Sequence, residues 1–312
     1  MRYFAKKFST LIITLLLVSF FTFIAFHIIP GDSATSSLGT SATKEAIEAL
    51  REKMGLNDNI LIRYFNWLSS SLRGDFGVSS QSNLPVKVLV GDRMPVTLWL
   101  SVLSIGIIIM ISLPLGILAA KKEGGWLDHM ITFLTHTAMA IPPFFLGIII
   151  TLVFGIGLKW FTPGSYISPS DNFGQFIGFM IFPALAIAIP KIAMVVKFLR
   201  SSVLRQMQLD YVRTARSKGN LETVILYRHV LKNALIPVIT FFAMVVADVL
   251  AGSIIVEQVF GLPGIGRQLV TAISNRDYAV VQVIILYIAI VVVVINFIVD
   301  MLYQQIDPRI RV

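Results

Sequence analysis

The sequence contains no cysteine at any of its 312 positions. Disulfide bonds, thiol nucleophiles and cysteine-ligated zinc or iron–sulfur sites are therefore excluded. Charged residues are also scarce, at 14% of the chain, whereas hydrophobic residues make up 56%. Such a chain is too apolar for an ordinary soluble domain, so we expect it to be surrounded by lipid.

Motifs of several enzyme classes are missing as well. None of the four histidines belongs to an H-E-x-x-H sequence. No phosphate-binding G-x-x-x-x-G-K-[ST] loop occurs either, because the glycine-rich run 261–266 continues into Arg267 and Gln268. We therefore expect a chain that is not an enzyme and binds no nucleotide, metal or other cofactor itself.

Six apolar runs are long enough to cross about 30 Å of hydrocarbon at about 1.5 Å per helical residue. They predict an all-α, polytopic membrane protein with spans near residues 9–29, 97–119, 130–153, 176–199, 234–256 and 281–303. The first run resembles a signal peptide, but its apolar stretch exceeds the usual length of about 7–15 residues, and no A-x-A-like cleavage site follows it. We therefore expect a retained membrane anchor.

The net charge is +9, but the basic residues are scattered between apolar runs instead of forming one stripe. Membrane topology explains this distribution better than nucleic acid, which is not an expected partner. Since basic loops remain in the cytoplasm, we expect both termini there. The segments then placed inside carry Arg2, Lys6 and Lys7, Lys121 and Lys122, eight basic residues from Lys197 to Lys232, and Arg309 and Arg311.

The predicted organisation is an anchor over 1–29, an extracytoplasmic segment over 30–95 and a five-helix core over 96–312. Helical spacing of apolar residues predicts two amphipathic helices in the second segment. The residues that carry this spacing are Ala46, Ile47, Leu50 and Met54, then Leu61, Tyr64, Phe65, Leu68 and Leu72. These helices either pack onto the bundle and the membrane surface or offer a docking surface to an external partner.

The longest cytoplasmic loop, residues 200–233, is rich in charge and in helix-forming residues. Its pattern predicts one helix, a break at Gly219 and a second helix. Such a loop can present a short helix to a soluble partner. The alternative is a solvated hairpin that has no partner.

This loop contains the run Asp210-Tyr-Val-Arg-Thr-Ala-Arg-Ser-Lys-Gly219 and then Tyr227-Arg-His-Val-Leu-Lys-Asn-Ala-Leu-Ile-Pro237. Both runs resemble the coupling loop of binding-protein-dependent ABC permeases of the dipeptide, oligopeptide and nickel branch. Further segments resemble the same branch in the expected order, so the resemblance covers nearly the whole chain. They are Ile29-Pro-Gly-Asp32, Gly74-Asp-Phe-Gly-Val-Ser79, Arg93-Met-Pro-Val-Thr-Leu98, Phe182-Pro-Ala-Leu-Ala186, Phe198-Leu-Arg-Ser-Ser202 and Val259-Phe-Gly-Leu-Pro-Gly-Ile-Gly266.

The resemblance implies a set of residues that couple the permease to an ATPase. They are Arg213, Thr214, Ala215, Arg216, Lys218 and Gly219. The broader family has Glu-Ala-Ala at positions 213–215 and a proline at Lys232, so Arg213 would need an acidic or carbonyl partner instead. Gly219 permits a positive φ or a close approach, and Ala215 is expected to keep the contact surface small.

The resemblance also implies partners and a function. The partners are a second homologous permease subunit, two cytoplasmic ABC ATPases that bind ATP and Mg, and an extracytoplasmic solute-binding protein, all at a bacterial or archaeal plasma membrane. The function is ATP-driven import of short peptides, with nickel or a metal chelate as the alternative substrate. An ion-coupled secondary transporter is a further alternative, but it needs no docking loop and commonly shows inverted repeats, which we do not find.

Two ionisable residues inside predicted spans are candidates for the translocation pathway, because charge is costly in lipid. Lys191 lies roughly 12 Å and Asp248 roughly 21 Å from the inner ends of their spans. Direct pairing would have to close about 9 Å of depth, so we expect each residue to face the pathway or a partner subunit. Asp300 and His27 fall near the interfaces, where both are expected to be solvated.

The run 261–266 on the outer side is a further candidate. Its residues Gly261, Pro263 and Gly264 break the backbone near the membrane surface, where irregular structure must be buried in protein or line a cavity. A structural turn and a gate-lining element are both compatible with this pattern.

Overall fold

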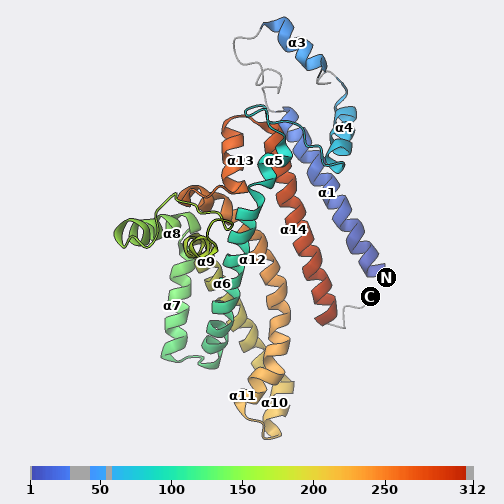
Figure 1. The fold of residues 1–312 in the computed structure, drawn as a ribbon. Helices are drawn as coiled ribbons and strands as arrows, with labels where there is room; N and C mark the ends of the chain where they lie inside the picture. Colours follow the sequence, from blue (N-terminus) through green and yellow to red (C-terminus); the bar gives the residue numbers. More distant parts are fainter. Residues whose placement is uncertain (1, 29–42, 54–57, 307–312) are drawn as a thin grey trace. The chain divides into compact units, whose positions relative to one another are not determined.

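The structure is a computed structural model that describes residues 2–28, 43–53 and 58–306 (Figure 1). Within these ranges the regular structure is helical, apart from an isolated bridge between Val78 and Pro85, which agrees with the expected all-α fold. Ile29-Pro-Gly-Asp32, Met54, Arg309 and Arg311 lie outside the described residues, as do the side chains of His27 and Asp300. The elements, including π-helical segments η1 and η2, are α1 (Arg2–Ile28), α3 (Lys44–Lys53), α4 (Ile60–Leu72), α5 (Val86–Gly91), α6 (Met94–Lys121), α7 (Trp126–Ala140), α8 (Pro143–Ile150), η1 (Thr151–Gly157), α9 (Phe173–Met207), α10 (Asp210–Ser217), α11 (Glu222–Val224), η2 (Ile225–Val230), α12 (Leu231–Phe260), α13 (Ile265–Ser274) and α14 (Tyr278–Ile306).

Five helical stretches in the described part of the chain are long and apolar enough to cross a membrane. They correspond to five of the six expected spans. Their bounds are Lys6–Phe26, Val86–Lys121, Phe173–Met207, Glu222–Phe260 and Tyr278–Val299.

The remaining expected span, 130–153, is not one straight helix. Its two halves, Trp126–Ala140 and Pro143–Gly157, meet at an angle of 98°. The break falls at Ile141, whose backbone is extended with φ −95° and ψ 121°. Two prolines follow Ile141, and a residue before proline is pushed out of the α region while proline itself has no N–H to donate. The span count is therefore six only if this bent pair is one span.

The chain packs as two compact units. Unit 1 comprises residues 1–97 and 263–294, and unit 2 comprises residues 98–262 and 295–312. This division by packing is distinct from the division by membrane topology that the sequence predicts. Each unit is described by itself.

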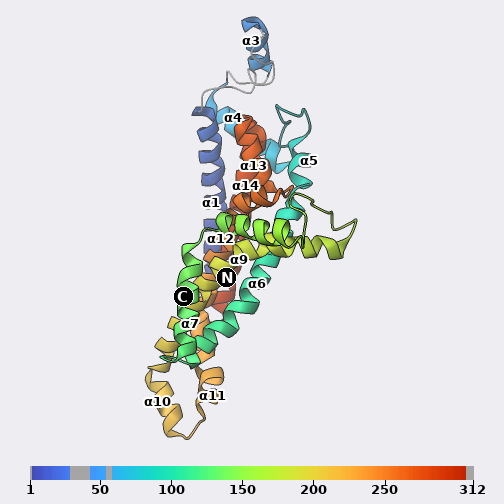
Figure 2. The ribbon, with the colours of Figure 1, turned by 90° about the vertical axis from the view of Figure 1, so that its left-hand side faces the viewer.

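In unit 1, helix α4 packs on the N-terminal helix α1 (Figure 2). Tyr64 is buried, and its hydroxyl lies 2.8 Å from the Oγ of Ser19. The rings of Phe20 and Phe23 meet the Tyr64 ring edge-on, with centroids 5.2 and 5.5 Å away. The helices predicted at 46–54 and 61–72 are present as α3 and α4, and α4 uses its aromatic face for packing within the chain.

The motif Gly74–Ser79 forms a loop in unit 1. Gly74 and Gly77 have φ of +81° and +78°, a conformation that glycine adopts without strain. The Oδ1 of Asp75 accepts the N–H of Gly77 at 3.0 Å. Ser79 donates its hydroxyl to the buried carboxylate of Asp277, directly before α14. The Gly-Asp-Phe-Gly spacing therefore fits a loop that the two glycines allow to turn and that these hydrogen bonds hold in place.

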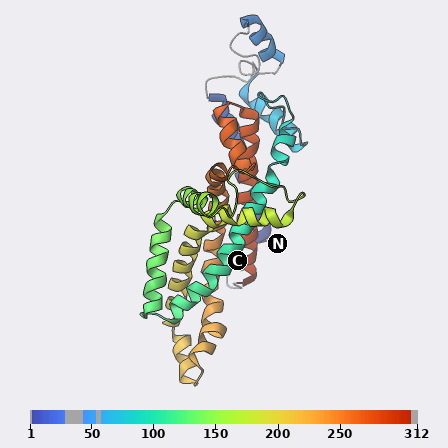
Figure 3. The same cartoon turned by 60° about the vertical axis from the view of Figure 1, so that its left-hand side comes forward.

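Unit 2 is built around α9, which is the most buried of the membrane-crossing helices described. Helices α7 and α12 pack along it (Figure 3). The pair α10 and α11 projects from the same end of the unit as the turn between α6 and α7 (Figure 1). The two basic loops that the sequence places inside, 121–122 and 200–233, therefore lie at one end of this unit.

Candidate functional site

The loop between α9 and α12 folds as the predicted helix, break and helix. Helix α10 ends in a Schellman motif, in which the N–H of Asn220 bonds the Ala215 carbonyl at 3.3 Å and that of Gly219 bonds the Arg216 carbonyl at 2.9 Å. Gly219 has φ +79°, and a Cβ added there would meet nothing within 4 Å. The positive φ, and not a close approach within the chain, is what requires glycine here. We call residues 210–230 the coupling hairpin, after the ATPase-coupling role that the sequence predicts for them.

One side of the coupling hairpin is apolar and faces the chain itself. Val212 and Ala215 of α10 are buried, and so are Ile225 and Leu226 of the second arm. The hairpin is therefore a packed element rather than a loose loop. The structure places Ala215 on this inner side, where its small side chain contributes to packing.

The other side of the coupling hairpin is polar. Arg216 bonds Glu222 through two contacts, Nε to Oε1 at 2.6 Å and Nη2 to Oε2 at 3.1 Å. This forked pair joins the two arms across the Gly219 turn, and it raises the pKa of Arg216 above its ordinary value. Arg216 already has an in-chain partner, which the sequence did not reveal.

Three further residues that the sequence predicts to couple the permease to an ATPase lie on the exposed surface of the hairpin. Arg213 pairs only loosely with Asp210, at 3.3 Å and with both side chains open to solvent. Thr214 donates its hydroxyl to the Asp210 carbonyl at 3.0 Å, and Lys218 is exposed at the end of α10. Exposed pairs of this kind are worth little to stability, so Arg213 and Lys218 remain available to a partner.

Lys191 and Asp248 form an ion pair, contrary to our expectation that they would not pair directly. The Nζ of Lys191 lies 2.7 Å from the Oδ2 of Asp248. The expectation assumed that residues 199 and 234 lie at the same depth. In the structure Ala234 is level with Ser202 instead, because the Oγ of Ser202 donates to the Ala234 carbonyl at 2.8 Å. Lys191 lies 11 residues before Ser202 and Asp248 lies 14 after Ala234. The gap is thus three residues, or about 4.5 Å, which a lysine side chain spans.

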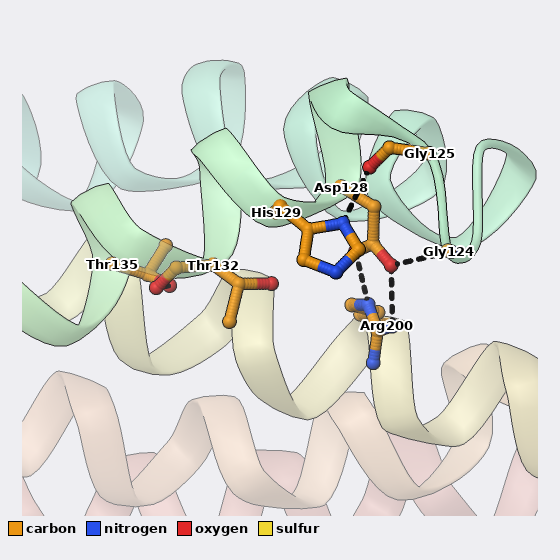
Figure 4. Close-up of polar contacts among 7 residues, drawn as sticks. All are labelled: Gly124, Gly125, Asp128, His129, Thr132, Thr135 and Arg200. Atoms are coloured by element: carbon orange, nitrogen blue, oxygen red, sulfur yellow. Dashed lines mark hydrogen bonds and ion pairs between the residues drawn. The ribbon is translucent and has the colours of Figure 1, made fainter.

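A second ion pair, which the sequence analysis missed, ties α7 to α9 (Figure 4). Arg200 reaches Asp128 through two contacts, Nε to Oδ1 at 2.6 Å and Nη2 to Oδ2 at 2.7 Å. The Oδ2 also accepts the N–H of Gly124 at 3.0 Å, and His129 Nδ1 lies 2.8 Å from the Gly125 carbonyl. The Asp128 side chain is 5% exposed. The pair fixes the turn between α6 and α7 to the end of α9 that leads into the coupling hairpin.

The run 261–266 forms the turn after α12. Gly261 has φ +70°, and the N–H of Leu262 bonds the Glu257 carbonyl at 2.9 Å, which is again a Schellman ending. Gly264 has an extended backbone and directly precedes the first turn of α13. Pro263 lies between the end of α12 and the start of α13. The structure thus accounts for these residues as a helix cap and turn, and a gate-lining role for them stays a prediction.

Within residues 2–28, 43–53 and 58–306 no cluster of three or more His, Asp or Glu side chains is placed to hold a metal ion. Some charged groups of unit 2 instead form ion pairs, and the pairs Lys191–Asp248 and Arg200–Asp128 join neighbouring helices.

Comparison with known families agrees with this architecture. Residues 112–312 match the family described as binding-protein-dependent transport system inner membrane component, and residues 1–101 match its N-terminal membrane component. The chain belongs to this family. It is therefore a membrane permease component of a transport system and not a catalytic subunit, and it is a multi-pass protein of the inner membrane.

Relatives of this permease are similar over nearly their entire length. A probable peptide ABC transporter permease of Sinorhizobium fredii is 34% identical over 309 residues, which is 99% of each chain. An oligopeptide transport system permease of Bacillus subtilis is 37% identical over 95% of each chain. A glutathione transport system permease of Escherichia coli K12 is 35% identical over 100% of this chain and 99% of its own.

Proposed function

We propose that this permease is one of two membrane subunits of an ATP-driven importer of short peptides. Two cytoplasmic ABC ATPases and an extracytoplasmic solute-binding protein complete the complex. The family is defined by dependence on a binding protein, and the relatives above are named for peptides or for glutathione, itself a small peptide. Nickel, a metal chelate and ion-coupled carriage gain no support from these similarities.

The observation that carries this proposal is the coupling hairpin. It is internally packed, clamped by the Arg216–Glu222 pair and open at Arg213 and Lys218. A packed element of this kind can transmit motion between two bistable parts, whereas a loose loop cannot. We assign its exposed basic face to an acidic or carbonyl-rich surface of the ATPase.

The hairpin is continuous with a helix pair that crosses the membrane. Helices α9 and α12 run antiparallel, and contacts between them continue up the pair from the hairpin. Ser202 bonds the Ala234 carbonyl at 2.8 Å, and the rings of Phe198 and Phe241 stack with centroids 4.4 Å apart. The Lys191–Asp248 ion pair follows at 2.7 Å. A displacement of the hairpin therefore moves α9 and α12 together.

The energy source distinguishes this function from ion-coupled carriage. In proteoliposomes with the complete complex and its binding protein, we expect peptide uptake to stop when ATP is removed and to persist when ionophores collapse ion gradients. The purified permease alone is expected to hydrolyse no ATP, since it lacks a phosphate-binding loop. Uptake that follows the ion gradient, or stoichiometric hydrolysis by a contaminant-free preparation of the single chain, would disprove the proposal.

The proposed orientation places both termini and the coupling hairpin in the cytoplasm. A reporter fused near Ser69, in external helix α4, is then expected outside, and one near Lys218 inside, because basic loops are retained in the cytoplasm. Paired phosphatase and fluorescent-protein fusions measure this directly. Both positions on the same side of the membrane would contradict the orientation.

A further inference from the structure

Helix α12 presents an exposed stripe that includes a charge. Exposed residues recur every three or four positions along it, which is one face of a helix. They are Thr240, Met244, Asp248, Ala251 and Ile255. The stripe belongs to the membrane-crossing stretch Glu222–Phe260. A carboxylate on such a face indicates that the stripe does not face lipid, because ionisable groups in spans turn toward protein or water.

The two partners of the ion pair are unequally covered. The side chain of Lys191 is 15% exposed and that of Asp248 is 53% exposed. Lys191 belongs to helix α9 and extends to the stripe on α12. Its ammonium therefore lies on the more covered side of the Asp248 carboxylate. Lys191 therefore holds Asp248 in place, while much of the carboxylate remains open to a second cationic partner.

We propose that Asp248, backed by Lys191, is a contact site for the amino-terminal ammonium group of the transported peptide. This inference rests on the proposed function, since it assigns a charged group of the peptide to a place on the permease. The stripe on α12 is then a water-accessible wall of the translocation pathway.

The chemistry of the pair favours an ammonium over a carboxylate. A carboxylate has about four lone-pair positions, so Asp248 can accept a second N–H donor while it keeps Lys191. A peptide carboxylate would instead have to approach the largely covered Lys191 past the negative charge of Asp248. The positive charge of Lys191 also weakens the attraction between Asp248 and the peptide ammonium. This suits a transport site, because such a site must bind weakly enough for its ligand to leave.

The absence of cysteine makes a local electrostatic test possible. Met244→Cys introduces a thiol that is unique in this chain, one turn from Asp248, where side chains lie about 5–6 Å apart. In the complete transporter, this thiol is labelled with a cationic and an anionic methanethiosulfonate reagent of similar size, with and without ATP. Ile255→Cys, two turns away on the same stripe, is the matched control position.

We expect the cationic reagent to react about three- to tenfold faster than the anionic one at position 244, with a smaller ratio at 255. Asp248→Asn should abolish or reverse this preference, because the Lys191 ammonium is then the only charge of the pair. Lys191→Met should increase it. A dipeptide with a free amino terminus should slow labelling at position 244, whereas its N-acetylated form should not, and Asp248→Asn should abolish the difference.

Failure of labelling at position 244 in every nucleotide state would place the stripe against a second subunit or lipid, and would overturn the inference. Labelling without charge preference, or equal protection by both dipeptides, would also overturn it. Uptake by the same preparations separates the two proposals. If ATP-dependent peptide import persists while these labelling results fail, the proposed function stands and the ammonium site is wrong.

Discussion

Replacing Arg200 with methionine is expected to destabilise the permease by about 3 kcal/mol, because it leaves the Asp128 carboxylate buried without its cation. Removal of one partner of a buried pair costs about 3–5 kcal/mol. We expect the lower end of that range, since the Arg200 side chain is 28% exposed. Thermal unfolding of the purified permease in detergent, followed by its intrinsic fluorescence, measures the change.

Two comparisons isolate the buried charge as the cause. Asp128→Ala combined with Arg200→Met removes both charges and should recover much of the loss. Arg213→Met breaks an exposed pair on the same face of the membrane and should cost less than about 1 kcal/mol. Equal effects of Arg200→Met and Arg213→Met would show that Asp128 and Arg200 do not act as a buried clamp.

Much of the fold could be predicted because lipid imposes a simple rule on sequence. Apolar length alone located the membrane helices, and helical spacing located α3 and α4. Hydropathy shows how long an apolar run is but not whether its helix is straight, so the 98° bend at Ile141 was missed. The signal was nevertheless present in Pro142 and Pro143, which follow Ile141 and disfavour a continuous helix.

The ion pairs could not be predicted because each depends on how two distant helices align. Lys191 and Asp248 are 57 residues apart, and Asp128 and Arg200 are 72 apart. Depth measured from assumed span ends was wrong by about 4.5 Å, enough to reject a pair that exists. The break at Gly219 could be predicted from the sequence, because it depends only on neighbouring residues and on the conformational freedom of glycine.

Gly219→Val is expected to weaken the contact between the permease and its ATPase about 5- to 150-fold while leaving membrane insertion intact. Gly219 has φ +79°, where a β-branched residue is an outlier, and such strain costs about 1–3 kcal/mol. The valine would force the turn to change and would separate the arms that Arg216 and Glu222 join. Co-purification of the ATPase at matched membrane levels, together with peptide uptake, measures the effect.

The backbone origin of this effect can be separated from a steric one, because a Cβ at Gly219 meets nothing within 4 Å of the chain itself. Asparagine tolerates the left-handed conformation better than other residues with a side chain. If φ is decisive, ATPase recovery should fall in the order Gly219→Asn, Gly219→Ala, Gly219→Val. A loss that follows side-chain size instead, with Asn more damaging than Ala, would mean that the ATPase surface approaches this position closely. Normal recovery and normal uptake with Gly219→Val would show that the hairpin is solvated and that its coupling role is wrong.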